Sequence, residues 1–276
     1  MNATVPLALF YVIVSICLAL VFVYLWLSNF QETRPFKYFG LIFVSAVIAV
    51  DLFVLIKTGF ESIRMSPIMI AFMDALAAIK IYAISVVGMM FAQRLDDDAS
   101  NLTPSILQKN QQTSYSKITL SKSALYYALM LTIFMMIYSY LLFSFSDAKI
   151  GDALRTSTNH TFEVTAVGII VAGSMGFGEE IVFRLGLQNA LTYLWRSSRY
   201  GHLLAVIIVS AFWSIGHIGA IDPDWVKFVQ VFVFGLMLGQ LNQMYGVLPC
   251  MISHSLFNVS MAAIAPQVLG NGLISG

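Results

Sequence analysis

The chain alternates long apolar stretches with short polar ones, and the apolar stretches are long enough to cross a lipid bilayer. A spanning helix needs about 20 mostly apolar residues. Stretches of this kind cover residues 4–28, 39–57, 67–92, 123–145, 162–185, 202–220, 226–243 and 247–265. They are not separated by runs of alternating apolar and polar positions, which are typical of half-buried strands. The pattern predicts an all-α protein, a polytopic membrane helix bundle with about eight transmembrane helices.

One long polar stretch interrupts this pattern near the middle of the chain. It contains the triplet Asp96-Asp97-Asp98, followed by many amide and hydroxyl side chains. We interpret residues 96–122 as a polar linker loop, because no other metal ligand lies near the acidic triplet in the sequence. Residues 1–95 then form an N-terminal three-helix membrane region. Residues 123–276 form a C-terminal membrane domain, which holds the candidate catalytic chemistry.

The composition supports a membrane protein and excludes several other classes. Hydrophobic residues make up 59% of the chain and charged residues 11%, whereas soluble domains have about 25% charged residues. The formal net charge of +1 gives no basis for a nucleic-acid partner. The two cysteines have neither the number nor the spacing of a disulfide framework or a metal site. The lipid bilayer is therefore the expected partner, and the sequence leaves the oligomeric state open.

Three polar clusters lie inside the apolar stretches of the C-terminal part. Residues 179–184 read Glu-Glu-Ile-Val-Phe-Arg, residues 213–217 read Trp-Ser-Ile-Gly-His, and residues 254–258 read His-Ser-Leu-Phe-Asn. An ionisable side chain at the centre of a bilayer costs about 2.5–3.5 kcal/mol on the insertion scale. We therefore expect these side chains to face one another, or water, in a shared interior cavity.

The spacing in the first cluster gives its two carboxylates different surroundings. On a helix, Glu180 and Arg184 are four residues apart and share a face, while Glu179 points about 100° away from Glu180. Glu180 is then paired with a cation. Glu179 has no cation in its own helix and is better suited to exchange protons. The alternative interpretation is that Glu180 and Arg184 form an ion pair that only stabilises helix packing, and that Glu179 has no catalytic role.

The other two clusters add imidazole and amide groups. His217 follows Trp213 by one helical turn, and His254 and Asn258 share a helix face. A glutamate, two histidines and an asparagine around one cavity can activate water and stabilise a tetrahedral intermediate without a serine or cysteine nucleophile. The same glutamate and histidines are also typical of catalytic zinc. We favour a site without metal or other cofactor, because the histidines lie on different segments. The zinc alternative stays open.

A few charged residues also lie in the N-terminal apolar stretches. Asp51 falls in the second stretch, and Asp74 and Lys80 fall in the third. Lys80 is expected to pair with Asp51 across two helices and so to stabilise their packing. A transporter with a polar path through these residues is disfavoured, because the two parts of the chain show no inverted repeat.

At the three clusters the chain resembles the CPBP family of intramembrane proteases, which contains CAAX prenyl endopeptidases and bacteriocin-processing or immunity proteins. The pattern of that family is Glu-Glu-x-x-x-Arg, then Phe-x-x-x-His, then His-x-x-x-Asn, on successive helices. The first and third motifs match in spacing, whereas Trp213 stands where the family has phenylalanine. The resemblance covers about residues 162–263 and leaves the N-terminal helices without a counterpart.

The resemblance implies four catalytic residues. Glu179 would be the general base that activates water, and His217 would help to hold that water. His254 and Asn258 would line the oxyanion site. It further implies a glutamate-type peptidase, in preference to a metalloprotease-like one, that hydrolyses a peptide bond in a membrane-associated peptide or protein.

The remaining residues of the clusters would have supporting roles. Glu180 and Arg184 would stabilise the first motif, and Trp213 would form an aromatic wall of the pocket. The expected location is a bacterial inner membrane, as a multi-pass protein. The alternative function is that of a non-catalytic CPBP-like membrane protein, acting in immunity or in regulation of a membrane partner.

Overall fold

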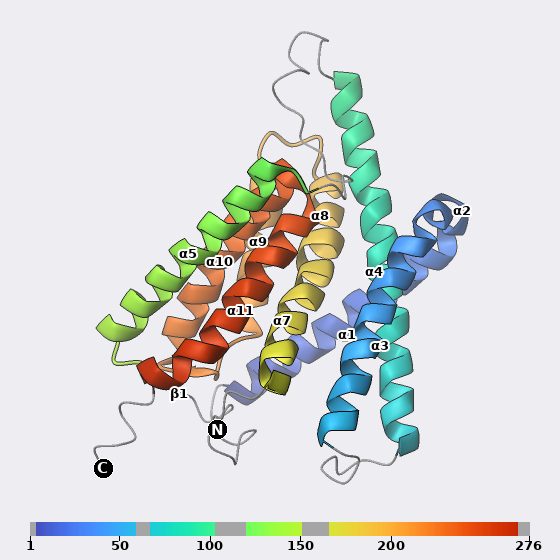
Figure 1. Ribbon diagram of the computed structural model, residues 1–276. Helices are drawn as coiled ribbons and strands as arrows, with labels where there is room; N and C mark the ends of the chain where they lie inside the picture. Colours follow the sequence, from blue (N-terminus) through green and yellow to red (C-terminus); the bar gives the residue numbers. More distant parts are fainter. Residues whose placement is uncertain (1–3, 59–66, 103–119, 151–165, 270–276) are drawn as a thin grey trace.

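The computed structural model describes residues 4–58, 67–102, 120–150 and 166–269, and most of these residues are helical (Figure 1). The N-terminal part contains α1 (Thr4–Ser28), α2 (Phe30–Thr33), the 3₁₀ helix η1 (Arg34–Phe36), α3 (Lys37–Thr58) and α4 (Pro67–Leu102). The C-terminal part contains α5 (Lys122–Phe145), α7 (Ala166–Glu180), the π-helix η3 (Ile181–Gln188), α8 (Asn189–Leu194), α9 (Gly201–Ile215), α10 (Asp224–Tyr245) and α11 (Val247–Leu269). The predicted all-α bundle is confirmed. In the described ranges, strands are limited to β1 (Lys149–Ile150) and β2 (Ile221–Asp222), which pair antiparallel.

The described helices identify a multi-pass membrane protein. By length and composition, four described segments can cross a membrane: Met73–Asp98, Lys122–Phe145, Asp224–Tyr245 and Val247–Ile264. The pair Val12–Ser28 and Phe30–Ala46, bent by 92°, raises this to five if it is one span. This is fewer than the predicted number of spans, although each predicted stretch contains a helix. Within the described residues, the difference arises because the first two stretches form the bent pair, α9 is short, and the fifth stretch is divided between α7 and the π-helix η3.

The end of α4 corrects the prediction for the acidic triplet. Asp96, Asp97 and Asp98 lie in the helix, which continues to Leu102, rather than in a loop. At this charged end of the helix, the Nε of Arg196 lies 3.1 Å from Oδ2 of Asp98. Residues 103–119 of the expected linker lie outside the described residues. The division of the chain into three parts stays a prediction.

The segments α7, η3 and α8 follow one another along the chain as one rod in the middle of the molecule (Figure 1). One side of η3, with Ile181 and Leu185, packs in a cluster with residues of α1, α3 and α4. Phe183 instead packs in a second cluster around Trp213. Gly88 of α4 permits the close approach, because a Cβ atom there would be 2.6 Å from the carbonyl oxygen of Leu185. The rod therefore joins the two parts of the protein.

Helix α11 lies against both α7 and α5, and it carries the third polar cluster to the rod (Figure 1). Gly246 makes the tight turn from α10 into α11, since its φ of 78° is a conformation that favours glycine. The hydroxyl groups of Thr132 and Ser253 are 3.1 Å apart and link α5 to α11. Hydrogen bonds of this kind stabilise helix packing inside a membrane.

Candidate functional site

The first polar cluster lies where α7 becomes the π-helix η3. Glu179 and Glu180 are the last residues of α7, and π-helical turns occur often at functional sites. The Glu180 side chain is 0% exposed, whereas that of Glu179 is 23% exposed. The two neighbouring carboxylates therefore point in different directions. Glu180 is enclosed by protein and Glu179 lines a cavity.

Glu180 is bound on both of its carboxylate oxygens. Its Oε2 accepts a hydrogen bond from Nε of Arg184 at 3.3 Å, and its Oε1 lies 2.8 Å from Nδ1 of His254. Arg184 is also fully buried, and its Nη1 donates to Oε1 of Gln188 at 3.4 Å. A buried charge is tolerated when it is paired and hydrogen-bonded. Glu180 thus balances Arg184 and orients the His254 ring.

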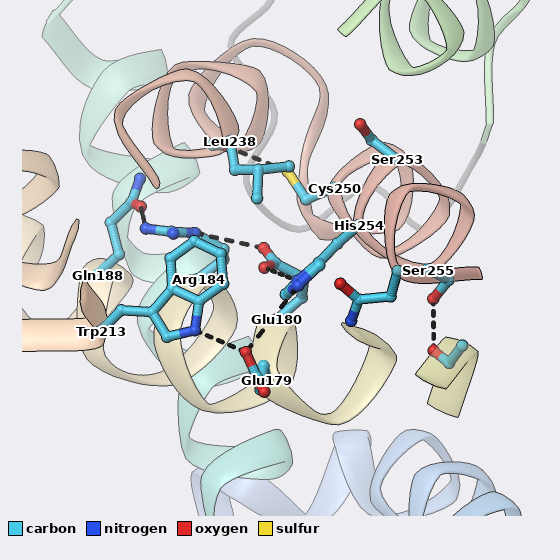
Figure 2. A network of polar contacts seen from close by, with 12 residues as sticks. Glu179, Glu180, Arg184, Gln188, Trp213, Leu238, Cys250, Ser253, His254 and Ser255 are labelled. Atoms are coloured by element: carbon cyan, nitrogen blue, oxygen red, sulfur yellow. Dashed lines mark hydrogen bonds and ion pairs between the residues drawn. The ribbon is translucent and has the colours of Figure 1, made fainter. Parts of the chain in front are cut away.

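Glu179 has a different set of neighbours, and Figure 2 shows its contacts with Trp213 and His254 beside the Glu180 network. Its Oε2 accepts a hydrogen bond from the indole Nε1 of Trp213 at 2.6 Å. The same oxygen is 3.8 Å from Nε2 of His217 and 4.0 Å from Nε2 of His254. These two separations exceed direct hydrogen bonds and are typical of polar groups that share a water molecule. Glu179 is therefore a carboxylate surrounded by two imidazoles and a neutral donor.

The hydrogen bonds also fix how the two imidazoles are presented. Nδ1 of His217 is 2.9 Å from the backbone carbonyl oxygen of Trp213, so this nitrogen carries the hydrogen. Nδ1 of His254 likewise donates to the Glu180 carboxylate. In the neutral form, both rings then turn an unprotonated Nε2 toward Glu179.

Asn258 lies one helical turn beyond His254. Its Nδ2 donates to the backbone carbonyl of Ala172 at 3.2 Å, and Oγ of Ser255 donates to the carbonyl of Gly173 at 2.8 Å. These two bonds fasten α11 to α7. The described contacts bring the other six expected site residues into one network and place Asn258 beside it.

Two further residues belong to the surroundings of the site, although the motifs do not include them. Gln188 is fully buried and donates from Nε2 to the carbonyl of Gly239 at 2.9 Å, which extends the Arg184 network to α10. The sequence signal that could have identified Gln188 is its spacing of four residues from Arg184, which places the two side chains on one helix face. Lys227 lies in the first turns of α10, near enough to act electrostatically on His217 and Glu179. Nothing in its local sequence distinguishes it from a residue at the end of a span.

The donors of this network contact one another rather than forming an open ligand set. Among the described residues, no group of three or more His, Cys, Asp or Glu side chains is arranged to hold a metal ion. The arrangement offers instead one partly exposed carboxylate with two imidazole nitrogens close to it. Such groups can accept, hold and return a proton.

A mostly apolar cavity of about 440 Å³ reaches Glu179. Half of its described lining comes from the N-terminal helices, with Ser15, Leu18, Ala19 and Phe22 on α1 and Lys80, Ile81 and Ile84 on α4. The charged members of this lining are Lys80 and Glu179. The expected pair of Lys80 with Asp51 is untested, because the Asp51 side chain lies outside the described residues. The N-terminal part therefore helps to form the space beside Glu179.

Residues 161–260 match the family described as type II CAAX prenyl endopeptidase, Rce1-like. The predicted resemblance is confirmed over this Rce1-like segment, which contains all three polar clusters and leaves out α1 to α5. Over 99 residues the chain is also 29% identical to the sporulation-killing factor biosynthesis protein SkfC of Bacillus subtilis strain 168. That match covers 35% of this chain and 19% of SkfC, so it spans about a fifth of the relative's length. No solved structure matches the chain.

Proposed function

We propose that the protein is a membrane-embedded endopeptidase in which Glu179 activates water to hydrolyse a peptide bond of a membrane-associated peptide or protein. The observation that carries this proposal is the approach of two imidazole Nε2 atoms, from His217 and His254, to one carboxylate oxygen beside an apolar cavity. The Rce1-like match over residues 161–260 supports the same reaction class.

In the proposed reaction, Glu179 removes a proton from water while the water oxygen bonds to the peptide carbonyl carbon. The carbonyl electron pair moves onto its oxygen and gives a tetrahedral oxyanion. Glu179 then passes the proton to the peptide nitrogen as the carbon–nitrogen bond breaks, which releases a carboxylic acid and an amine. This is general acid–base catalysis without a covalent intermediate.

The surrounding residues have defined roles in this proposal. His217 holds the attacking water by accepting its second hydrogen at Nε2. In its doubly protonated form His254 donates from Nε2 to the oxyanion, while its Nδ1 stays bonded to the Glu180 carboxylate at 2.8 Å. Asn258 adds the second hydrogen of its amide nitrogen, because only one is engaged by Ala172.

The substrate in this proposal reaches Glu179 through the apolar cavity. An apolar lining favours a peptide segment that is itself lipid-soluble or bound at the bilayer surface. The protein then acts as a multi-pass enzyme of the bacterial inner membrane, and the Bacillus relative supports a bacterial setting.

The proposal is tested by comparing new protein N-termini in membranes that contain the wild type, Glu179→Gln or Glu32→Gln. Glutamine keeps the shape of Glu179 but cannot take the proton, and loss of a general base lowers rates by roughly 10²–10⁴-fold. Glu32 is a matched control, because it is a 55% exposed glutamate on α2. We expect a set of N-termini in the wild-type and control membranes that is absent with Glu179→Gln at equal protein levels. Identical N-termini in all three membranes contradict the proposal and favour a non-catalytic role.

A further inference from the structure

We infer that Trp213 is a positioning residue, whose indole N–H holds the Glu179 carboxylate in the orientation needed to activate water. This inference rests on the proposed function. In the family pattern that the chain resembles, the corresponding residue is phenylalanine, which has no hydrogen-bond donor. The Trp213 indole makes a polar contact with the reacting carboxylate that a phenylalanine ring cannot make.

The contact is short and enclosed. Trp213 is 1% exposed, and its Nε1 lies 2.6 Å from Oε2 of Glu179. The bond joins α9 to the last turn of α7, so two helices that are far apart in the sequence meet at this carboxylate. Hydrogen bonds to an ionised acceptor are roughly twice as strong as neutral ones. A phenylalanine ring at position 213 would fill most of the same space and leave Oε2 without this donor.

The indole ring also gives the two glutamates different electrostatic partners. The Arg184 guanidinium lies over its face, 5.3 Å from the ring centroid, while Glu179 lies at its N–H edge (Figure 2). An aromatic ring has a negative face and a positive edge, so both contacts are favourable. Arg184 therefore contacts Glu180 and the indole ring, whereas Glu179 accepts a hydrogen bond from a neutral donor.

The same ring contacts both imidazoles that approach Glu179. Its centroid is 5.4 Å from that of His217 and 5.0 Å from that of His254, both in edge-to-face arrangement. In addition, the backbone carbonyl of Trp213 accepts the Nδ1 hydrogen of His217. Trp213 thus fixes the general base and the water-holding imidazole relative to each other.

Two replacements of Trp213 separate the N–H group from the bulk of the ring. Trp213→Phe removes the donor and part of the ring. Insertion of β-(3-benzothienyl)alanine at the same position keeps the bicyclic shape and replaces only the N–H by sulfur. Trp195→Phe is the matched control, since Trp195 is the C-cap residue of α8 and the described hydrogen bond of Glu179 does not involve it.

The first measurement is the infrared carboxylate band of Glu179 in the full-length protein in detergent, identified as the band that Glu179→Gln removes. We expect the band to shift in both Trp213 variants and to stay in place in Trp195→Phe. The second measurement is the cleavage of a synthetic peptide that spans a bond found by the N-terminus comparison. We expect kcat to fall on the order of ten- to a hundredfold in both Trp213 variants, with KM nearly unchanged.

A Glu179 band that does not move in the benzothienyl variant overturns the inference, as does a kcat equal to or above that of the wild type. The benzothienyl variant keeps the packing volume, so a melting temperature close to that of the wild type shows that the folded state is compared. Cleavage that persists in Glu179→Gln contradicts the proposed function itself. Cleavage lost in Glu179→Gln but unchanged in the benzothienyl variant contradicts only the role of Trp213.

Discussion

Replacing Glu180 should destabilise the protein far more than replacing its neighbour Glu179. Glu180 and Arg184 are both 0% exposed, and their atoms Oε2 and Nε are 3.3 Å apart. Glu180→Gln leaves the Arg184 cation buried without a counter-charge, and removal of one partner of a buried pair costs about 3–5 kcal/mol. Glu179→Gln should cost about 1 kcal/mol, because the amide oxygen still accepts the indole hydrogen bond and the group is partly exposed.

The free energy of unfolding in detergent micelles, measured by titration with a denaturing detergent, checks this difference. We expect Glu180→Gln to lose about 3–5 kcal/mol relative to the wild type. The double variant Glu180→Gln with Arg184→Met should recover most of that loss, since neither charge is then left unpaired. The reasoning is refuted if Glu180→Gln unfolds like Glu179→Gln, or if the double variant is no more stable than Glu180→Gln alone.

Three other predictions concern helix contact, the cavity and the surface. Gly176→Ala should reduce both stability, by about 1–3 kcal/mol, and peptide cleavage, because a Cβ atom there would be 3.0 Å from backbone atoms of α11. Gly178→Ala is the matched control for stability, as its Cβ atom would meet nothing within 4 Å, and equal losses of stability in the two variants would contradict the packing argument. Lys80 is the cation in the described lining of the cavity beside Glu179. Lys80→Ala should therefore raise KM severalfold for peptides with an acidic group and leave kcat nearly unchanged, whereas Lys80→Arg should behave like the wild type. An equal KM for acidic and amidated peptides in the wild type would remove the basis for this role. Arg196→Ala should cost less than about 1 kcal/mol in the same unfolding assay, because Arg196 and Asp98 are 47% and 46% exposed, and a loss comparable to that of Glu180→Gln would be inconsistent with a surface ion pair.

The local spacing of polar residues was sufficient to predict much of the geometry around the first cluster. The interval of four between Glu180 and Arg184 predicts a shared helix face, and the structure places their side chains 3.3 Å apart. The absence of a cation four residues from Glu179 predicts its separate surroundings in the same way. Such intervals are reliable because they depend only on helix geometry.

Contacts between distant helices could not be predicted from the same information. The indole N–H of Trp213 bonds to a residue 34 positions earlier, and an aromatic side chain in an apolar stretch is most simply interpreted as a packing residue. Likewise, the apolar pattern of α1 contains nothing to show that Phe22 lines a cavity beside Glu179. Hydropathy likewise does not reveal that the π-helix η3 follows α7 within the fifth apolar stretch.

The cavity wall built by α1 and α4 has a consequence for how relatives of this protein should be compared. The hydrolytic groups of the proposed enzyme all come from residues 161–260, but half of the described lining beside Glu179 comes from helices outside that range. The hydrolytic reaction and the choice of substrate would therefore depend on separate stretches of the polypeptide. Two proteins with identical motifs could cut unrelated targets, and exchanging the first 102 residues between them should transfer preference without altering the cleavage reaction.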